Sequence, residues 1–245
     1  MASAQPFRFE SEMLSCIRSA FPSLLALLNH SSVTWLWKAA IGSVVPDLLA
    51  GVFGDDICTP KKPVTNVEAH ILALIDQCGK LSEDEVRAHL HLSDSGAFRA
   101  FTSLKRSGMI RLEPTGKLIL AEHSWLSSVQ IIAFEVKLHR WTDALAQAES
   151  YLVFADKSYA VLDRMQVRPT ARMVRRFQES SVGLILQQGD QFEEVCEARP
   201  VACSTPEKIV AVQKLCYEGT SLLSDSTQTP AWSFHRSNAS SHTLW

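Results

Sequence analysis

The sequence lacks several patterns that identify common classes of enzyme and membrane protein. It contains no glycine-rich phosphate loop, no Gly-x-Ser-x-Gly turn and no histidine-rich cluster, which argues against the usual small-molecule enzymes. No stretch reaches the ~18 uncharged apolar residues that a membrane-spanning helix needs. The first residues do not combine a basic region, an apolar core and a small-residue cleavage site. We therefore expect a cytoplasmic protein without a membrane partner.

The chain also has little net charge and no recognisable cysteine pattern. Its 24 Lys and Arg residues nearly balance its 26 Asp and Glu residues, which leaves a net charge of −2. Any contact with nucleic acid must therefore come from a local basic surface. The six cysteines show neither Cys-x-x-Cys spacing nor a histidine at zinc-finger distance, which favours reduced thiols. With 245 residues, 46% of them hydrophobic, the chain is typical of a globular protein of one or two domains.

The strongest strand signal lies between residues 129 and 138, where β-branched and aromatic side chains form an apolar run. Because side chains alternate along a strand, Glu135 and Lys137 point to one face, while Phe134 and Val136 point to the other. Burying a charge is costly unless the charge is paired or holds an ion. The pair therefore indicates a functional site, with a solvated strand end as the ordinary alternative.

A helix and a second strand are expected after this run. Residues 141–155 contain helix-forming residues and place Gln147 and Tyr151 one turn apart on one face. Residues 157–162 are again typical of a strand. The pattern predicts a βαβ unit.

These residues carry a resemblance to a known family. Phe134-Glu135-Val136-Lys137, followed by Gln147-x-x-x-Tyr151, resembles the core of the PD-(D/E)xK nuclease superfamily, and the second element is similar to that of its RecB-like branch. The family pattern includes an upstream Asp, often after Pro, and Pro46-Asp47 matches it. The resemblance implies an α/β fold with a mixed sheet, the restriction-endonuclease-like core.

The resemblance also implies a chemistry. Asp47, Glu135 and the main-chain carbonyl of Val136 would bind Mg²⁺ or Mn²⁺, and Lys137 would position the attacking water. The implied activity is metal-dependent hydrolysis of phosphodiester bonds in nucleic acid, with DNA as the favoured substrate.

Four further residues are implied around this site. Gln147 and Tyr151 would anchor nucleic acid or support the site. The first helix of this fold can lend an acidic metal ligand, for which Glu10 and Glu12 are the candidates. The alternative is that both acids only complement the dipole of that helix.

The position of Asp47 depends on the strands that surround it. Residues 33–37 and 43–53 are expected to form two strands, and a hairpin between them would place Asp47 in the middle of the sheet. In the alternative, Pro46 and Asp47 only form a turn that divides the second run.

A different pattern fills residues 63–123. Residues 66–78, 82–90 and 93–108 favour three helices, and residues 109–120 favour a hairpin. This order resembles a winged helix-turn-helix module with a core of its own. The expected core residues are Ile71, Leu74, Val86, Leu90, Phe98, Phe101 and Leu104. The module would be an insertion between the strands that carry Asp47 and Glu135.

In winged helices that bind DNA, the third helix enters the major groove. Arg99, Lys105 and Arg106 on that helix, together with Lys117 in the hairpin, are therefore the candidate nucleic-acid contacts. Many such modules bind only protein, so a protein partner or a second copy of the chain is the alternative.

The remaining chain completes the expected organisation. Arg172, Arg175 and Arg176 lie in a short predicted helix and are either a phosphate-contacting surface or a solvated face. We expect a discontinuous nuclease-like domain from residues 1–62 and 124–220, followed by a disordered tail from residue 221. The rival function is a non-catalytic regulator that binds DNA or protein through the winged helix.

Overall fold

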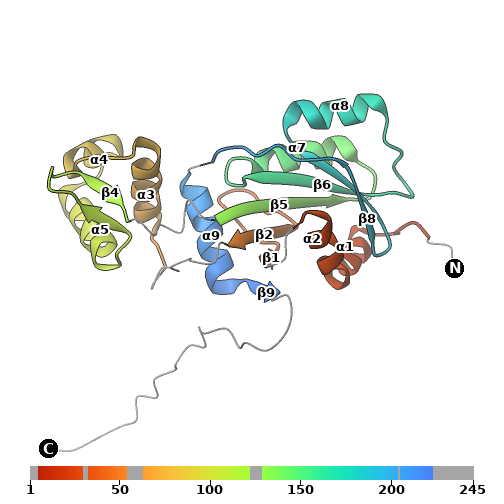
Figure 1. The fold of residues 1–245 in the computed structure, drawn as a ribbon, viewed down its shortest axis with the longest axis horizontal. Coiled ribbons are helices and arrows are strands. Elements are labelled where there is room, and N and C mark those ends of the chain that lie inside the picture. Colours follow the sequence, from red (N-terminus) through yellow and green to blue (C-terminus); the bar gives the residue numbers. More distant parts are fainter. Residues whose placement is uncertain (1–4, 30–32, 54–62, 122–128, 204, 223–245) are drawn as a thin grey trace, which may run out of the picture.

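The computed structural model describes residues 5–29, 33–53, 63–121, 129–203 and 205–222 (Figure 1). The helices are α1 Glu10–Ser19, α2 Phe21–Leu27, α3 Asn66–Cys78, α4 Glu83–His89, α5 Asp94–Arg106, α7 Trp141–Tyr151, α8 Ala171–Ser180 and α9 Pro206–Glu218. The strands are β1 Val33–Trp37, β2 Leu48–Phe53, β3 Ile110–Leu112, β4 Leu118–Leu120, β5 Val129–Lys137, β6 Lys157–Asp163, β7 Gly183–Gln188, β8 Gln191–Cys196 and β9 Thr220–Leu222.

The main sheet is mixed and has the strand order β8-β7-β6-β5-β2-β1-β9. Strands β5, β6 and β7 are parallel, and the pairs toward both edges are antiparallel. The helices α7 and α8 connect the three parallel strands. The expected mixed α/β class and the βαβ unit are therefore confirmed.

Side chains of β5 alternate between two apolar clusters. Ile132, Phe134 and Val136 pack against α1 and α2 on one face of the sheet. Ile131 and Ala133 pack on the other face, in the cluster that contains α9 and the end of α7. Strict alternation therefore places the odd-numbered residues of β5 on the α7 and α9 face.

The inserted segment consists of three helices and the two-stranded sheet of β3 and β4. Each helix starts at a hydroxyl residue, Thr65, Ser82 or Ser93, whose side chain accepts a hydrogen bond from a main-chain N–H of the first turn. We call residues 63–121 the module. Figure 1 shows it at one end of the molecule, beyond α9.

The module joins the sheet where β2 ends and β5 begins. Phe53, the last residue of β2, pairs with Val129, the first residue of β5. Residues 54–128 therefore depart from and return to neighbouring positions of one antiparallel pair. The apolar cluster of the module is also continuous with that of the sheet, because Ile71 and Ile75 of α3 belong to the same cluster as Val212 and Leu215 of α9.

One expected residue of the module core is wrong. Ile71, Val86, Phe101 and Leu104 are buried, but Phe98 is 71% exposed. The reason is helical geometry: the inward stripe of α5 runs through Ala97, Ala100, Phe101 and Leu104, and residue 98 lies about 100° away from residue 97. Leu74 and Leu90 are partly buried and pack against the same core.

The strand expected over residues 43–53 is also shorter than predicted. It begins at Leu48, because Ile41 and Val44 close a turn in which Gly42 has a φ of 58°. Asp47 therefore precedes β2 and is not in the middle of the sheet. At the other terminus, Ser221 and Leu222 pair with β1 in β9 and do not belong to a disordered tail; residues 223–245 lie outside the described part.

Within the described ranges, no helix is both long enough and apolar enough to cross a lipid bilayer.

Candidate active site at the ends of two paired strands

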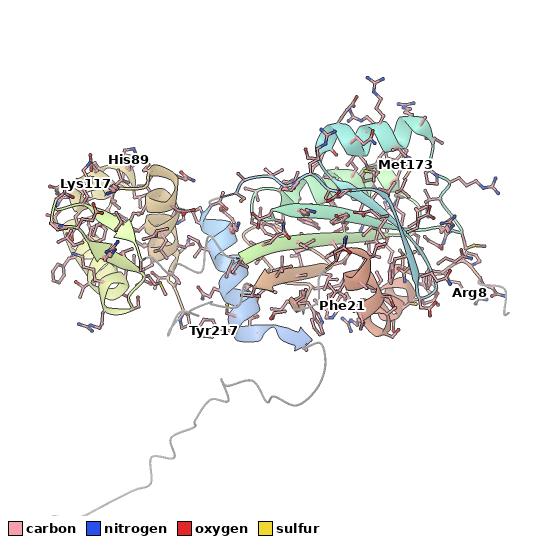
Figure 2. The ribbon with its side chains drawn as sticks, viewed as in Figure 1. Arg8, Phe21, His89, Lys117, Met173 and Tyr217 are labelled. Atoms are coloured by element: carbon pink, nitrogen blue, oxygen red, sulfur yellow. The ribbon has the colours of Figure 1, made fainter. Side chains whose placement is uncertain are left out.

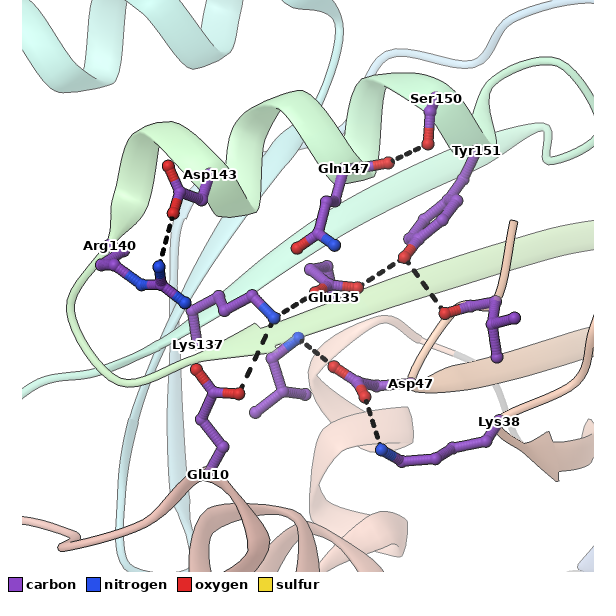
Figure 3. A network of polar contacts seen from close by, with 12 residues as sticks. Glu10, Lys38, Asp47, Glu135, Lys137, Arg140, Asp143, Gln147, Ser150 and Tyr151 are labelled. Carbon is purple, nitrogen blue, oxygen red and sulfur yellow. Dashed lines mark hydrogen bonds and ion pairs between the residues drawn. The ribbon is translucent and has the colours of Figure 1, made fainter. Parts of the chain in front are cut away.

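Asp47 lies beside β5 because of the register between β2 and β5. Leu48, the first residue of β2, pairs with Phe134, so Asp47, the residue before β2, reaches the level of Glu135. The Asp47 Oδ2 atom accepts a hydrogen bond of 2.9 Å from the main-chain N–H of Val136 (Figure 3). Its side chain is 14% exposed. The Asp47 carboxylate is thus held against β5, just before the first residue of β2.

Glu135 is a buried carboxylate whose two oxygens both have partners. Its Oε1 atom lies 2.7 Å from the Lys137 Nζ atom, and its Oε2 atom accepts a hydrogen bond of 2.5 Å from the Tyr151 hydroxyl. That hydroxyl also lies 3.4 Å from the carbonyl oxygen of Val45. Because a tyrosine hydroxyl has one proton to donate, the shorter contact indicates that the proton goes to Glu135.

Lys137 connects β5 to the first helix. Its Nζ atom is 3.7 Å from Glu10 Oε2, and its side chain is 13% exposed. Glu12 has another role, since its Oε2 atom accepts hydrogen bonds from the main-chain N–H groups of Arg8 and Phe9. The structure therefore brings Glu10 to the cluster, whereas Glu12 caps its own helix.

The contacts within the cluster shift the pKa values of Glu135, Lys137 and Tyr151. Burial raises the pKa of Glu135, and the nearby Asp47 charge adds to the increase, while the hydrogen bonds from Lys137 and Tyr151 oppose it. Burial works against the Lys137 ammonium, but the hydrogen bond and charge of Glu135 outweigh it and raise the pKa of Lys137. Burial, followed by the Glu135 interactions, raises the pKa of the Tyr151 hydroxyl. Lys137 is therefore charged and Tyr151 protonated at neutral pH.

Gln147 lies on α7, one turn before Tyr151, and is exposed. Figure 3 shows its side chain directed from α7 toward Glu135 on β5. The helix thus presents a buried hydroxyl and an exposed amide to the same strand. The amide lies at the solvent side of the cluster.

Lys38 belongs to this site but was not anticipated from the sequence. Its Nζ atom is 3.6 Å from Asp47 Oδ1, and its main-chain N–H donates to the Asp47 carbonyl at 3.1 Å. Its φ is 51°, a left-handed conformation that is uncommon for a residue other than glycine. Its position follows from the hairpin register: Trp37 pairs with Leu48, so Lys38, the residue after β1, lies opposite Asp47. No local sequence pattern specifies this register.

We define the site cluster as Glu10, Lys38, Asp47, Glu135, Lys137, Gln147 and Tyr151. Its hard oxygen donors are the two carboxylates held at β5 and the carbonyl of Val136, which is also on β5. The described part of the chain contains no group of three or more His, Cys, Asp or Glu side chains arranged to hold a metal. Any divalent ion here would therefore complete its coordination with water, as Mg²⁺ commonly does.

The candidate nucleic-acid contacts of the module are not part of this cluster. The module attaches at Val129, six residues before Glu135, which corresponds to about 20 Å along the strand. Lys105 pairs with Glu83, and Arg99 donates to the carbonyl of Ser95 in its own helix. Figure 2 shows Lys117 on the module, at the end of the molecule away from α1.

Comparison with known proteins adds little to this geometry. No family model matches the chain. No curated protein matches it either. Among solved structures, a protein of unknown function from Silicibacter pomeroyi is 21% identical, with a TM-score of 0.26, over 36% of this chain. The match covers 56% of the length of that protein.

Proposed function

We propose that the protein is a metal-dependent nuclease with a restriction-endonuclease-like core, and that it hydrolyses phosphodiester bonds, those of DNA above all. The observation that carries the proposal is the meeting of Asp47, Glu135 and Lys137 at the ends of two paired strands. Asp47 and Glu135 are 88 positions apart in the sequence, and the three residues match the motif order of the PD-(D/E)xK superfamily.

The residues present fit a hard divalent cation. Asp47, Glu135 and Glu10 carry three negative charges against the two cations of Lys38 and Lys137. Both oxygens of Glu135 already accept one hydrogen bond, but a carboxylate oxygen has a second lone pair for a metal. Asp47, Glu135 and the Val136 carbonyl would hold the ion. A bound Mg²⁺ would offset charge on the phosphate and lower the pKa of its water.

The side chains then have distinct roles. Lys137 orients the attacking water and offsets the negative charge that develops on the phosphate. Tyr151 fixes the orientation of Glu135 through the hydrogen bond of 2.5 Å. Gln147, exposed above the cluster, is placed to donate a hydrogen bond to a phosphate oxygen.

One observation favours the rival function for the module. Several of its charged residues pair with each other: Lys105 with Glu83, and Arg87 with Asp84 and Asp94. Phe98 on α5, by contrast, is an exposed apolar side chain. Such a surface is typical of a protein contact. A regulator that binds a protein partner through the module is therefore the second candidate.

The test is a cutting assay on linear, supercoiled and single-stranded DNA, with Mg²⁺ or Mn²⁺ and with chelator. Wild type should cut only with metal, and Glu135→Ala or Lys137→Ala should lose about two or more decades in rate. Glu149→Ala is the matched control, because Glu149 is an exposed carboxylate on α7 outside the cluster. Unchanged cutting by Glu135→Ala would place the activity elsewhere, and no cutting by wild type would favour the regulator.

A further inference from the structure

The segment from residue 164 to residue 176 concentrates positive charge in a protein of net charge −2. It contains five arginines, all of them exposed. They are Arg164, Arg168, Arg172, Arg175 and Arg176, which together we call the arginine face. The face covers the outside of α8 and the chain that leads into it from β6.

The orientation of α8 follows from its apolar residues. Met173 and Phe177 are buried against the sheet, one turn apart. Figure 2 shows Met173 on the side of α8 that faces the sheet. Arg172 and Arg176 have the same spacing on another side of the helix, so their guanidinium groups extend into solvent. The amphipathic pattern fixes this orientation because rotating the helix would bury arginine.

The positive charge of the face is only partly neutralised. Arg175 and Arg176 both pair with Glu179, and Arg164 pairs with Glu193. Among the described residues, no carboxylate forms an ion pair with Arg168 or Arg172. Five cations thus meet two carboxylates, which leaves an excess of positive charge on this exposed segment.

The arginine face lies next to the helix that borders the site cluster. The rings of Trp141 on α7 and Phe177 on α8 are 6.3 Å apart, and both helices pack on the same face of the sheet. Gln147 of the site cluster is on α7 as well. Packed helices are spaced by about 10 Å, so a polymer that occupies the site can also contact α8.

We infer that the arginine face binds the phosphodiester backbone of the nucleic acid that occupies the site cluster. This inference rests on the proposed function and names the surface that holds its substrate. The argument is charge complementarity: guanidinium groups bind phosphate oxygens in a planar, bidentate geometry, and a backbone presents such phosphates at regular intervals. Contacts to phosphate oxygens would position the substrate without selecting a sequence.

The experiment measures binding of a short fluorescent DNA duplex in the presence of chelator, so that cutting does not occur. Anisotropy titrations at several salt concentrations yield the slope of log Kd against log salt. The double variant Arg168→Gln/Arg172→Gln should lower the magnitude of this slope by about two, since each lost phosphate contact contributes about 0.9. Arg168→Lys/Arg172→Lys keeps the charge and should retain most of the slope.

The comparison variant is Arg99→Gln/Arg106→Gln, which removes two exposed arginines that are candidate nucleic-acid contacts on α5 of the module. The inference requires Arg168→Gln/Arg172→Gln to lower the slope whether or not this module variant does. A reduced slope in the module variant, with no change in Arg168→Gln/Arg172→Gln, would assign binding to the module and overturn the inference. Absence of DNA binding by wild type would overturn the inference too. Binding to phosphatidylserine vesicles is measured in parallel, and a loss of vesicle binding by Arg168→Gln/Arg172→Gln with unchanged DNA binding would also overturn it.

Binding and cutting separate the two proposals. If wild type does not cut DNA under any condition but Arg168→Gln/Arg172→Gln still lowers the slope, the arginine face stands and hydrolysis fails. If wild type cuts and the slopes are equal, hydrolysis stands and the arginine face fails. Thermal unfolding followed by circular dichroism shows whether each variant is folded. Its midpoint should equal that of wild type, as expected for substitutions at exposed positions.

Discussion

At the scale of single residues, Glu135 is the most constrained group of the site. It is 2% exposed, and it is held by a cation from its own strand and a hydroxyl from α7. Burial nevertheless dominates, so the pKa of this carboxyl is raised. Ionised Glu135 therefore lowers the stability of the folded protein, and a bound cation would offset this cost.

This cost should appear as a pH dependence of stability. The folded protein holds the Glu135 proton more tightly than the unfolded chain does, so the free energy of unfolding falls as pH rises from about 4.3 through the raised pKa. Glu135→Gln does not titrate. Its free energy of unfolding relative to wild type should therefore increase as pH rises through this window, in urea unfolding with chelator present. A difference that decreases with pH would contradict the raised pKa.

Lys38 makes a separate prediction about metal affinity. Its ammonium group, 3.6 Å from Asp47 Oδ1, competes with a cation for that carboxylate. Because Lys38 is 63% exposed, solvent screens the contact, and Lys38→Met should tighten Mn²⁺ binding by roughly two- to fivefold. Lys38→Arg retains the charge and should bind Mn²⁺ like wild type. Calorimetric titration measures both, and weaker binding by Lys38→Met would show that Lys38 supports the metal site.

At the scale of elements, α5 separates two phenylalanines that look equivalent in the sequence. Phe101 is 4% exposed and packs in the module core, whereas Phe98 is 71% exposed. Phe101→Ala should lower the free energy of unfolding by about 3–5 kcal/mol. Phe98→Ser should change it by less than about 0.5 kcal/mol. Urea unfolding of both variants checks the helix orientation, and a large loss in Phe98→Ser would mean that Phe98 is buried.

At the scale of the whole molecule, the module and the site cluster occupy opposite ends of β5. Phe53 and Val129 pair directly, so a two-residue Asn-Gly turn can replace residues 54–128 as a β-hairpin connection. The shortened protein should fold and keep its cutting activity, with lower stability because the face of α9 that packs on α3 becomes exposed. A shortened protein that is folded but inactive would show that the module takes part in hydrolysis.

The complementary experiment uses residues 63–121 alone. All three helices have side-chain caps and share a buried stripe, so the fragment should keep its helical circular-dichroism signal. Loss of that signal would show that the contact between α3 and α9 is required for folding and that the module is not an independent domain.

The sequence by itself determined the features that arise from local periodicity. The alternation of β5 predicted that Glu135 and Lys137 share a face, and the structure joins their charged groups at 2.7 Å. Helical spacing likewise predicted that Gln147 and Tyr151 lie on one side of α7. Such patterns depend on neighbouring residues, whose geometry is fixed by the backbone repeat.

Only the tertiary structure decided which distant residues meet in the site cluster. The contact of Asp47 with Val136 spans 89 positions, and it depends on a strand register that no local pattern specifies. Lys38 reaches the site through the pairing of β1 with β2. Of the two candidate acids, only Glu10 reaches Lys137, because Glu12 accepts hydrogen bonds from main-chain N–H groups at the start of its own helix. Phe98 is exposed because an amphipathic helix can bury only one stripe, and packing against α3 selected the stripe of Phe101.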